Sequence, residues 1–128
     1  ESFRAQAVSR AAKNMVERAE TVNGVHVVKA VLPIDPASAK DIVFKVREAL
    51  PKKLVCVLGS VHENRPLLSI MLSDDMVKDN NLNAGKIIRE AAKLIQGGGG
   101  GQPHYAQAGG KNADGIREAV DKVIELIS

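Results

Sequence analysis

The residues most suited to chemistry in this chain are glycines. Five consecutive glycines, residues 97–101, are followed by a second pair, Gly109 and Gly110, and then by Lys111. Without a Cβ, glycine lets backbone N–H groups come close to a phosphate or a sugar edge, and Lys111 would add charge there. A flexible linker is the alternative interpretation of a glycine run. Because helical patterns flank the segment and the second pair leads into one, we predict a phosphate-binding loop over residues 97–111.

The common nucleotide-binding motifs do not fit this glycine segment. A P-loop ending at Gly110 and Lys111 requires glycine where Tyr105 stands, and serine or threonine where Asn112 stands. No register completes the dinucleotide pattern G-x-G-x-x-G, because its last position falls on residue 102, 103 or 104, none of which is glycine. The segment is therefore predicted to be neither an ATP-binding loop nor a dinucleotide-binding turn.

Catalytic combinations of side chains are also missing from the sequence. The three histidines, at positions 26, 62 and 104, are scattered, and none stands at metal-ligand spacing from another histidine or from Cys56. Cys56 lies within an apolar run, which is typical of a small buried thiol. Asp74 and Asp75 follow an apolar run, where adjacent carboxylates are typical of a turn or a helix cap. We predict no catalytic residue, no metal site and no cofactor in this chain.

The elements that must position the glycine segment follow from hydrophobic periodicity. Helical spacing predicts a first helix through about residue 21, ending near residues 23–24, and a helix over residues 35–50. Apolar, β-branched runs predict strands at 25–32, 54–58 and 67–72, with an exposed loop over 59–66. A helix from residue 83 to about 95 precedes the glycine loop, and a last helix begins at residue 112.

This order predicts an α/β fold. Strand, helix and strand in succession imply at least one parallel pair, and the continuous apolar strands suggest a sheet covered on both faces. We expect a small mixed or parallel sheet covered by helices, with an N-terminal helix and a glycine-rich loop before the last helix. The predicted domains are residues 1–23, the tail of a longer helical segment, and residues 24–128, the α/β domain.

Charge and composition narrow the class of partner. The 128 residues have a net charge of +3, and all of this excess lies between residues 81 and 112, where Lys86, Arg89, Lys93 and Lys111 face a single acidic residue, Glu90. A basic surface beside a glycine run predicts a polyanionic partner, whereas a solvated helix face is the alternative. One tyrosine, two phenylalanines and no tryptophan argue against binding by rows of stacked bases.

The chain offers no membrane anchor, since no apolar run approaches the ~18 residues of a membrane span. It carries a single cysteine, so no disulfide within the chain is expected. It also begins at Glu1 without an initiator methionine, as expected for a fragment of a longer protein. These features together predict a cytoplasmic protein with no membrane partner.

Three segments carry a family resemblance: residues 83–86, residues 91–93 and the glycine segment 97–111, which contains Gly-Gly-Gly-Gly-Gln-Pro and then Ala-Gln-Ala-Gly-Gly-Lys. They resemble the C-terminal domain of alanyl-tRNA synthetases, and also the DHH-associated domain of phosphoesterases. The ending Ala-Gln-Ala-Gly-Gly-Lys favours the synthetase. The sequence departs from the family at Gln102, where arginine is common, and at His104, where an acidic residue is common.

This resemblance implies that tRNA binding and catalysis lie in different domains of one protein. The chain would hold alanine-specific tRNA, at the tRNA's outer corner, for upstream domains of the same protein that carry the ATP, magnesium and zinc chemistry. A homodimer is a further implied partner. The expected nucleic-acid contacts are the helix cations, the loop glycines and the polar loop side chains: Lys86, Arg89, Lys93, Gly98, Gly99, Gly100, Gly101, Gln102, His104, Tyr105, Gln107, Gly109, Gly110 and Lys111.

Two points remain open from sequence. Tyr105 would stack on a base, or else pack in the core of an aromatic-poor protein. The apolar stripe of the first helix, which includes Val8 and Met15, would pack on the sheet or on a second copy of the chain, and we expect partial self-association. Alternative functions are the substrate-binding domain of a DHH-type phosphoesterase and an oligomerisation module that uses this first helix.

Overall fold

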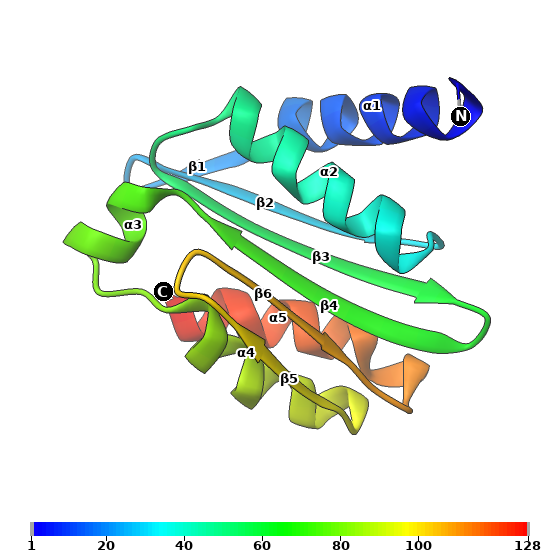
Figure 1. Ribbon diagram of the computed structural model, residues 1–128. Coiled ribbons are helices and arrows are strands. Elements are labelled where there is room, and N and C mark those ends of the chain that lie inside the picture. Colours follow the sequence, from blue (N-terminus) through cyan, green and yellow to red (C-terminus); the bar gives the residue numbers. More distant parts are fainter. Residues whose placement is uncertain (1, 128) are drawn as a thin grey trace.

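The computed structural model describes residues 2–127 and shows one six-stranded mixed sheet with helices on both faces (Figure 1). The strand order is β1-β2-β3-β4-β6-β5. β2 (Val25–Leu32) and β3 (Leu54–His62) are parallel, and every other neighbouring pair is antiparallel. The predicted α/β class and the covered mixed sheet are therefore confirmed. None of the described helices is long and apolar enough to span a bilayer.

Two helices cover one face of the sheet. They are α1 (Ser2–Glu17) and α2 (Pro36–Ala49), which begins where Asp35 accepts a hydrogen bond from the Ser38 N–H at 3.3 Å. Val8, Ala12 and Met15 of α1 are buried in a core that α2 and the sheet share. The apolar stripe of the first helix thus packs within the chain, which was one of its two expected positions.

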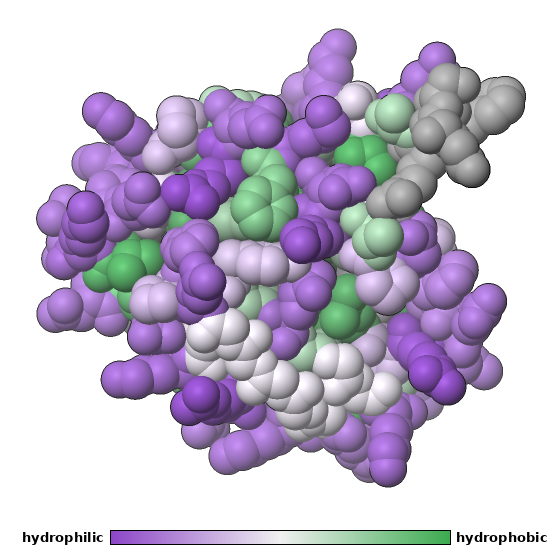
Figure 2. Space-filling model, viewed as in Figure 1, coloured by the Kyte–Doolittle hydropathy of each residue, from purple (hydrophilic) through white to green (hydrophobic). Residues whose placement is uncertain are grey.

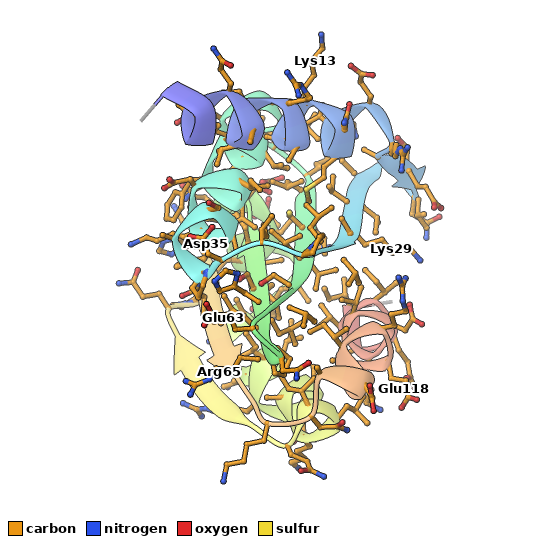
Figure 3. The ribbon with its side chains drawn as sticks, turned by 90° about the vertical axis from the view of Figure 1, so that its right-hand side faces the viewer. Lys13, Lys29, Asp35, Glu63, Arg65 and Glu118 are labelled. Atoms are coloured by element: carbon orange, nitrogen blue, oxygen red, sulfur yellow. The ribbon has the colours of Figure 1, made fainter. Side chains whose placement is uncertain are left out.

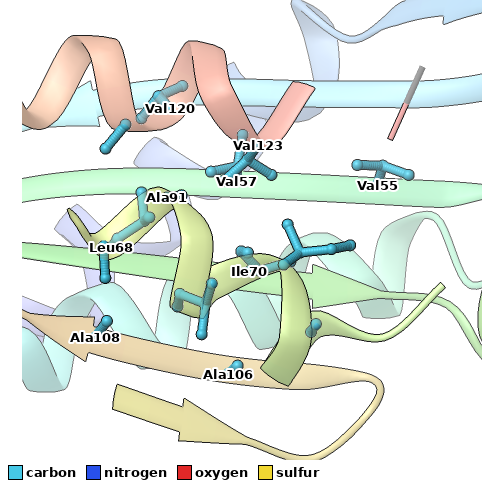
Figure 4. Packing of buried hydrophobic residues seen from close by; sticks show 14 of the residues in the cluster. Val55, Val57, Leu68, Ile70, Ala91, Ala106, Ala108, Val120 and Val123 are labelled. Carbon is cyan, nitrogen blue, oxygen red and sulfur yellow. The ribbon is translucent and has the colours of Figure 1, made fainter. Parts of the chain in front are cut away.

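The opposite face is covered by α4 (Ala84–Ala91), its 3₁₀ continuation η1 (Ala92–Ile95) and α5 (Ile116–Ile127). Figure 4 shows side chains of α4 and α5 meeting those of β3, β4 (Arg65–Leu72) and β6 (Tyr105–Gly109) in a single apolar cluster. Successive side chains of a strand point to opposite faces of the sheet, so each strand contributes to both cores. In β4, for example, Ile70 lies in the core under α4 and α5, and Met71 lies in the core under α1 and α2.

Three predicted boundaries are wrong, each because a turn was misread. The first helix ends at Glu17, and Asn23 and Gly24 form the left-handed turn between β1 (Glu20–Val22) and β2, with φ values of 52° and 81°. Most of the predicted loop 59–66 belongs to β3 and β4, joined through Glu63 and Asn64, both at positive φ. A 3₁₀ turn, η2 (Ala113–Gly115), precedes the last helix, α5.

Asp74 and Asp75 lie in the first turn of a short helix that the sequence analysis did not separate, α3 (Asp74–Asp79). The Arg47 guanidinium donates to the Asp74 carboxylate at 2.9 Å, and the Lys53 N–H donates to the Asp75 carboxylate at 2.9 Å. Both carboxylates therefore make contacts within the fold. They follow the N-cap residue of α3, Ser73, rather than forming the cap themselves.

The largest departure from expectation concerns the glycine segment, which is a β-hairpin rather than a loop. β5 (Gly98–Gly101) pairs antiparallel with β6, and β6 pairs with β4, so the hairpin extends the sheet (Figure 1). Glycine is depleted in strands because it contributes no side-chain packing, which is why its composition indicated a loop. The strand forms here because β6 offers a partner and α4 lies beside it, with the Ala84 N–H donating to the Pro103 carbonyl at 2.8 Å.

A candidate nucleic-acid interface around the glycine hairpin

The glycines of the hairpin divide into two sets. In the first set, at positions 97, 99 and 101, an added Cβ would lie 2.0 to 2.5 Å from a carbonyl oxygen of Gly109, Gln107 or Tyr105. Such distances are far inside van der Waals contact. These three glycines are therefore required by the close approach of β5 to β6, whatever the hairpin binds.

The second set comprises Gly98, Gly100 and Gly109, where an added Cβ would meet open space. Nothing lies within 4 Å of it at Gly98, and the nearest atoms are the Arg89 guanidinium at 3.9 Å from Gly100 and the Pro66 carbonyl oxygen at 4.0 Å from Gly109. None of these glycines has a positive φ. Neither packing nor backbone conformation explains them, so they leave bare main chain that a ligand can reach.

The turn of the hairpin is held by backbone hydrogen bonds. The Gln102 N–H donates to the Tyr105 carbonyl at 2.9 Å, and the Leu72 N–H donates to the His104 carbonyl at 2.8 Å. Gln102 is exposed and His104 is half-buried. Both side chains of the predicted site therefore lie at the turn, on a backbone fixed to β4 and α4.

Tyr105 lies on the face of β6 that contacts α2. Its ring centroid is 5.1 Å from that of Phe44, at an interplanar angle of 56°. Burial raises the pKa of the Tyr105 hydroxyl to about 12, and the hydroxyl oxygen is buried without a hydrogen-bond partner among the described residues. The packing alternative thus describes its position better than an exposed stacking platform does.

Gln107 lies two residues further along the same face. Its side-chain amide donates to the Ser69 hydroxyl of β4 at 3.4 Å. This weak contact holds the Gln107 side chain against β4. The backbone of Gln107 pairs with Gly100 of β5.

The predicted cations lie along one side of the hairpin. Lys86, Arg89 and Lys93 are exposed on α4 and η1. The Lys93 ammonium is 3.2 Å from the Glu90 carboxylate, and it is the one of the three cations with an ion pair among the described residues. The Arg89 guanidinium is the group nearest the open side of Gly100. In Figure 2 the pale band at the place of β5 lies among hydrophilic side chains. The structure thus brings Arg89 and one of the open glycines, Gly100, together.

A groove of about 1060 Å³ lies at the other end of the hairpin. Its lining includes residues of the β3–β4 turn and, from the glycine segment, Gly97, Gly98, Gly109, Gly110 and Lys111. Figure 3 views the molecule from this end, with Glu63 and Arg65 of the β3–β4 hairpin labelled near the centre and lower left. Lys111 and Lys86 are thus at different ends of the hairpin, since Lys86 lies in the first turn of α4, beside Gly101.

Sequence reasoning missed the groove residues outside the glycine segment: Ile34, Pro36, Ser60, His62, Glu63, Asn64, Arg65, Pro66, Leu67 and Gln96. They come from three separate parts of the chain, and only the sheet order brings them together. One signal was available, because two polar residues between strands, Glu63 and Asn64, are typical of a tight hairpin.

The other titratable groups do not form a site. The described residues contain no group of three histidine, cysteine or acidic side chains that could hold a metal ion. Cys56 is fully buried, and burial raises the pKa of its thiol to about 12. His26 lies on β2, and the His62 imidazole is 3.7 Å from the exposed Glu63 carboxylate.

The fold and the glycine hairpin define the class to which the protein belongs. The chain belongs to the DHHA1 domain family, whose sequence profile matches residues 23–128. It is similar to an alanine–tRNA ligase of Bacteroides fragilis, with 44% identity over 126 residues that make up 98% of this chain and 14% of that protein. An alanine–tRNA ligase of Cytophaga hutchinsonii is 34% identical over 128 residues, again 14% of its length.

Two solved structures have the same fold. The C-Ala domain of Aquifex aeolicus alanyl-tRNA synthetase superposes with a TM-score of 0.75 and 29% identity, covering 87% of this chain and 98% of that one. RecJ of Thermus thermophilus, solved in complex with Mn²⁺, gives a TM-score of 0.64 at 13% identity over 98% of this chain and 17% of its own, a likeness of fold alone. The resemblance to synthetase C-terminal domains is therefore confirmed.

Proposed function

We propose that this chain is the C-terminal tRNA-binding domain of an alanine–tRNA ligase and that it holds tRNA through the glycine hairpin and the cations beside it. The observation that carries the proposal is the bare main chain at Gly100, whose open side lies next to the Arg89 guanidinium. Bare main chain next to a guanidinium suits a phosphodiester backbone, because the guanidinium pairs with phosphate oxygens and no Cβ keeps the strand away. On this proposal, ATP, magnesium and zinc chemistry belongs to other domains of a cytoplasmic ligase.

The cations of the interface contribute to affinity by releasing counterions from the RNA. Each lysine or arginine that meets a phosphate adds about 0.7 to 0.9 to the slope of log K against log salt. Lys93 contributes less than Arg89, because Glu90 already neutralises part of its charge. Arg89 and Lys111 are therefore the most informative cations to remove.

The test is a titration of the chain with alanine-specific tRNA at several salt concentrations, followed by fluorescence anisotropy. We expect Arg89→Ala and Lys111→Ala each to weaken binding and to flatten the salt dependence. Lys13→Ala is the matched control, because Lys13 is exposed on α1 at the far end of the molecule from Arg65 and the groove (Figure 3). If neither interface variant differs from the control, tRNA binds elsewhere.

A backbone contact requires a different variant. Gly100→Val should weaken tRNA binding by placing a branched side chain on the open side of β5, with little change in the salt slope. Circular dichroism checks that the variant is folded. Unchanged affinity of a folded Gly100→Val would show that the main chain of β5 does not meet the RNA.

The finer partner assignments follow from the same proposal. Chemical footprinting of the bound tRNA tests contact at its outer corner, and sedimentation tests the homodimer, to which Val8, Ala12 and Met15 of α1 cannot contribute because they are buried within the chain. A chain that binds short single-stranded oligonucleotides but not tRNA would favour the phosphoesterase-type role. A stable dimer without RNA affinity would favour the oligomerisation module.

A further inference from the structure

The groove at the base of the hairpin has the size and the chemistry of a small-ligand site. Its volume, about 1060 Å³, is at the upper end of the ~300 to 1,000 Å³ range of sites that bind small molecules. Three parts of the chain line it: the entry to α2, the β3–β4 hairpin and the paired ends of β5 and β6. It lies at the opposite end of the hairpin from the turn that carries Gln102 and His104.

The groove is open because two of its glycines carry no side chain. Gly98 and Gly109 are paired across the β5–β6 ladder, and both line the groove. An added Cβ would meet nothing within 4 Å at Gly98 and only the Pro66 carbonyl oxygen, at 4.0 Å, at Gly109. Since neither glycine has a positive φ, the fold would accept side chains here, and those side chains would fill the groove.

The lining combines three kinds of group. Ile34 and Leu67 are half-buried and supply an apolar surface, whereas Asn64 and Gln96 supply side-chain amides that both donate and accept. Arg65 and Lys111 are exposed and both line the groove, to which they contribute positive charge. Glu63 is the acidic residue in the lining. It is exposed, with 82% of its side-chain surface accessible, and lies near His62.

We propose that this groove takes one unstacked nucleotide of a single-stranded or loop segment of RNA. The base lies against Ile34 and Leu67, its edge meets the amides, and the flanking phosphates meet Arg65 and Lys111. A base within a duplex has its edge paired and its faces stacked, so it cannot enter such a site; single-stranded and loop bases can. This inference rests on the proposed RNA-binding function and adds a preference for an unpaired nucleotide.

The test uses a short oligoribonucleotide that carries 2-aminopurine, whose fluorescence rises when the base leaves its stack, and a blunt RNA duplex as the second probe. We expect the unaltered chain to raise the fluorescence of the single strand. Gly98→Val, which fills the groove, should abolish the rise and weaken single-strand binding by about tenfold, a clearly larger loss than for the duplex, which can lose only a backbone contact. Arg65→Ala should also weaken single-strand binding, and Arg18→Ala, an exposed arginine after α1, is its matched control.

The outcomes separate the two proposals. If the unaltered chain binds no RNA, the proposed function fails. If it binds RNA but the 2-aminopurine signal is the same for Gly98→Val, the groove holds no base and only this inference fails. Equal losses for the single strand and the duplex would likewise overturn it, because the groove would then contact backbone alone. A urea titration of Gly98→Val establishes that the variant is folded, and Gly109→Val gives a second variant with the same expectation.

Discussion

Neighbouring glycines of β5 should respond to the same substitution with opposite sign. Gly98→Ala adds a methyl group that meets nothing within 4 Å, and it restricts the unfolded chain, so we expect the free energy of unfolding to rise by about 0.4 to 1 kcal/mol. Gly99→Ala places its Cβ 2.3 Å from the Gln107 carbonyl oxygen and 2.6 Å from the Ala108 Cα. Backbone must move to relieve both contacts, at a cost of about 1 to 3 kcal/mol.

Urea unfolding followed by circular dichroism measures this difference directly. The two variants should differ by about 1.4 to 4 kcal/mol, the sum of a small gain and an overpacking loss. The alanine side chain is the same in both, so intrinsic strand preference cancels. Equal changes at the two positions, or a stabilised Gly99→Ala, would refute the division of the glycines into a packed set and an open set.

Three further predictions concern single side chains. Tyr105→Phe should raise the free energy of unfolding by about 1 kcal/mol in urea titrations, because it removes a buried hydroxyl without a partner and keeps the ring against Phe44; a loss of stability would contradict this. Cys56 should resist a thiol reagent until the chain unfolds, since its pKa is raised to about 12 in a fully buried position; rapid labelling of the native chain would count against it. A hydrogen bond from the Ser73 side chain, supported by one from the Lys53 N–H, holds the pKa of Asp75 below 3.8. The ionised Asp75 carboxylate therefore stabilises the folded chain above that pH, and this stabilisation is lost as the pH falls through the lowered pKa. In acid titrations of unfolding, Asp75→Asn should lack this loss of stability. An acid transition identical to that of the unaltered chain would show that Asp75 does not contribute.

The sequence predicted three of the six described strands and all the long helices, because those elements carry a strong apolar pattern. The parallel pair of β2 and β3 followed from the strand–helix–strand order and is confirmed by its register, in which Val28 pairs with Cys56. The boundaries failed where a left-handed residue allowed a tight turn, as at Asn23. Tertiary packing, rather than local preference, decides those positions.

The glycine hairpin could not be predicted from its own residues. β5 has no side chains, so neither periodicity nor strand preference marks it, and only the presence of β6 and α4 makes it a strand. The cations of α4 were visible as charge, but the proximity of Arg89 to Gly100 depends on where the hairpin lies. The groove was hidden for the same reason, because only the strand order brings Arg65 and Lys111 into the lining of one groove.

The strand order also bears on the sequence of events in folding. β1 with β2, and β3 with β4, are hairpins between adjacent segments, whereas β6 must join β4 across the intervening α3 and α4. An isolated hairpin gains its stability from cross-strand side-chain pairs, and β5 offers none. We therefore expect the glycine hairpin to order late, on a surface that β4 and α4 have already formed. Substitutions within β5 should then alter the unfolding rate far more than the folding rate.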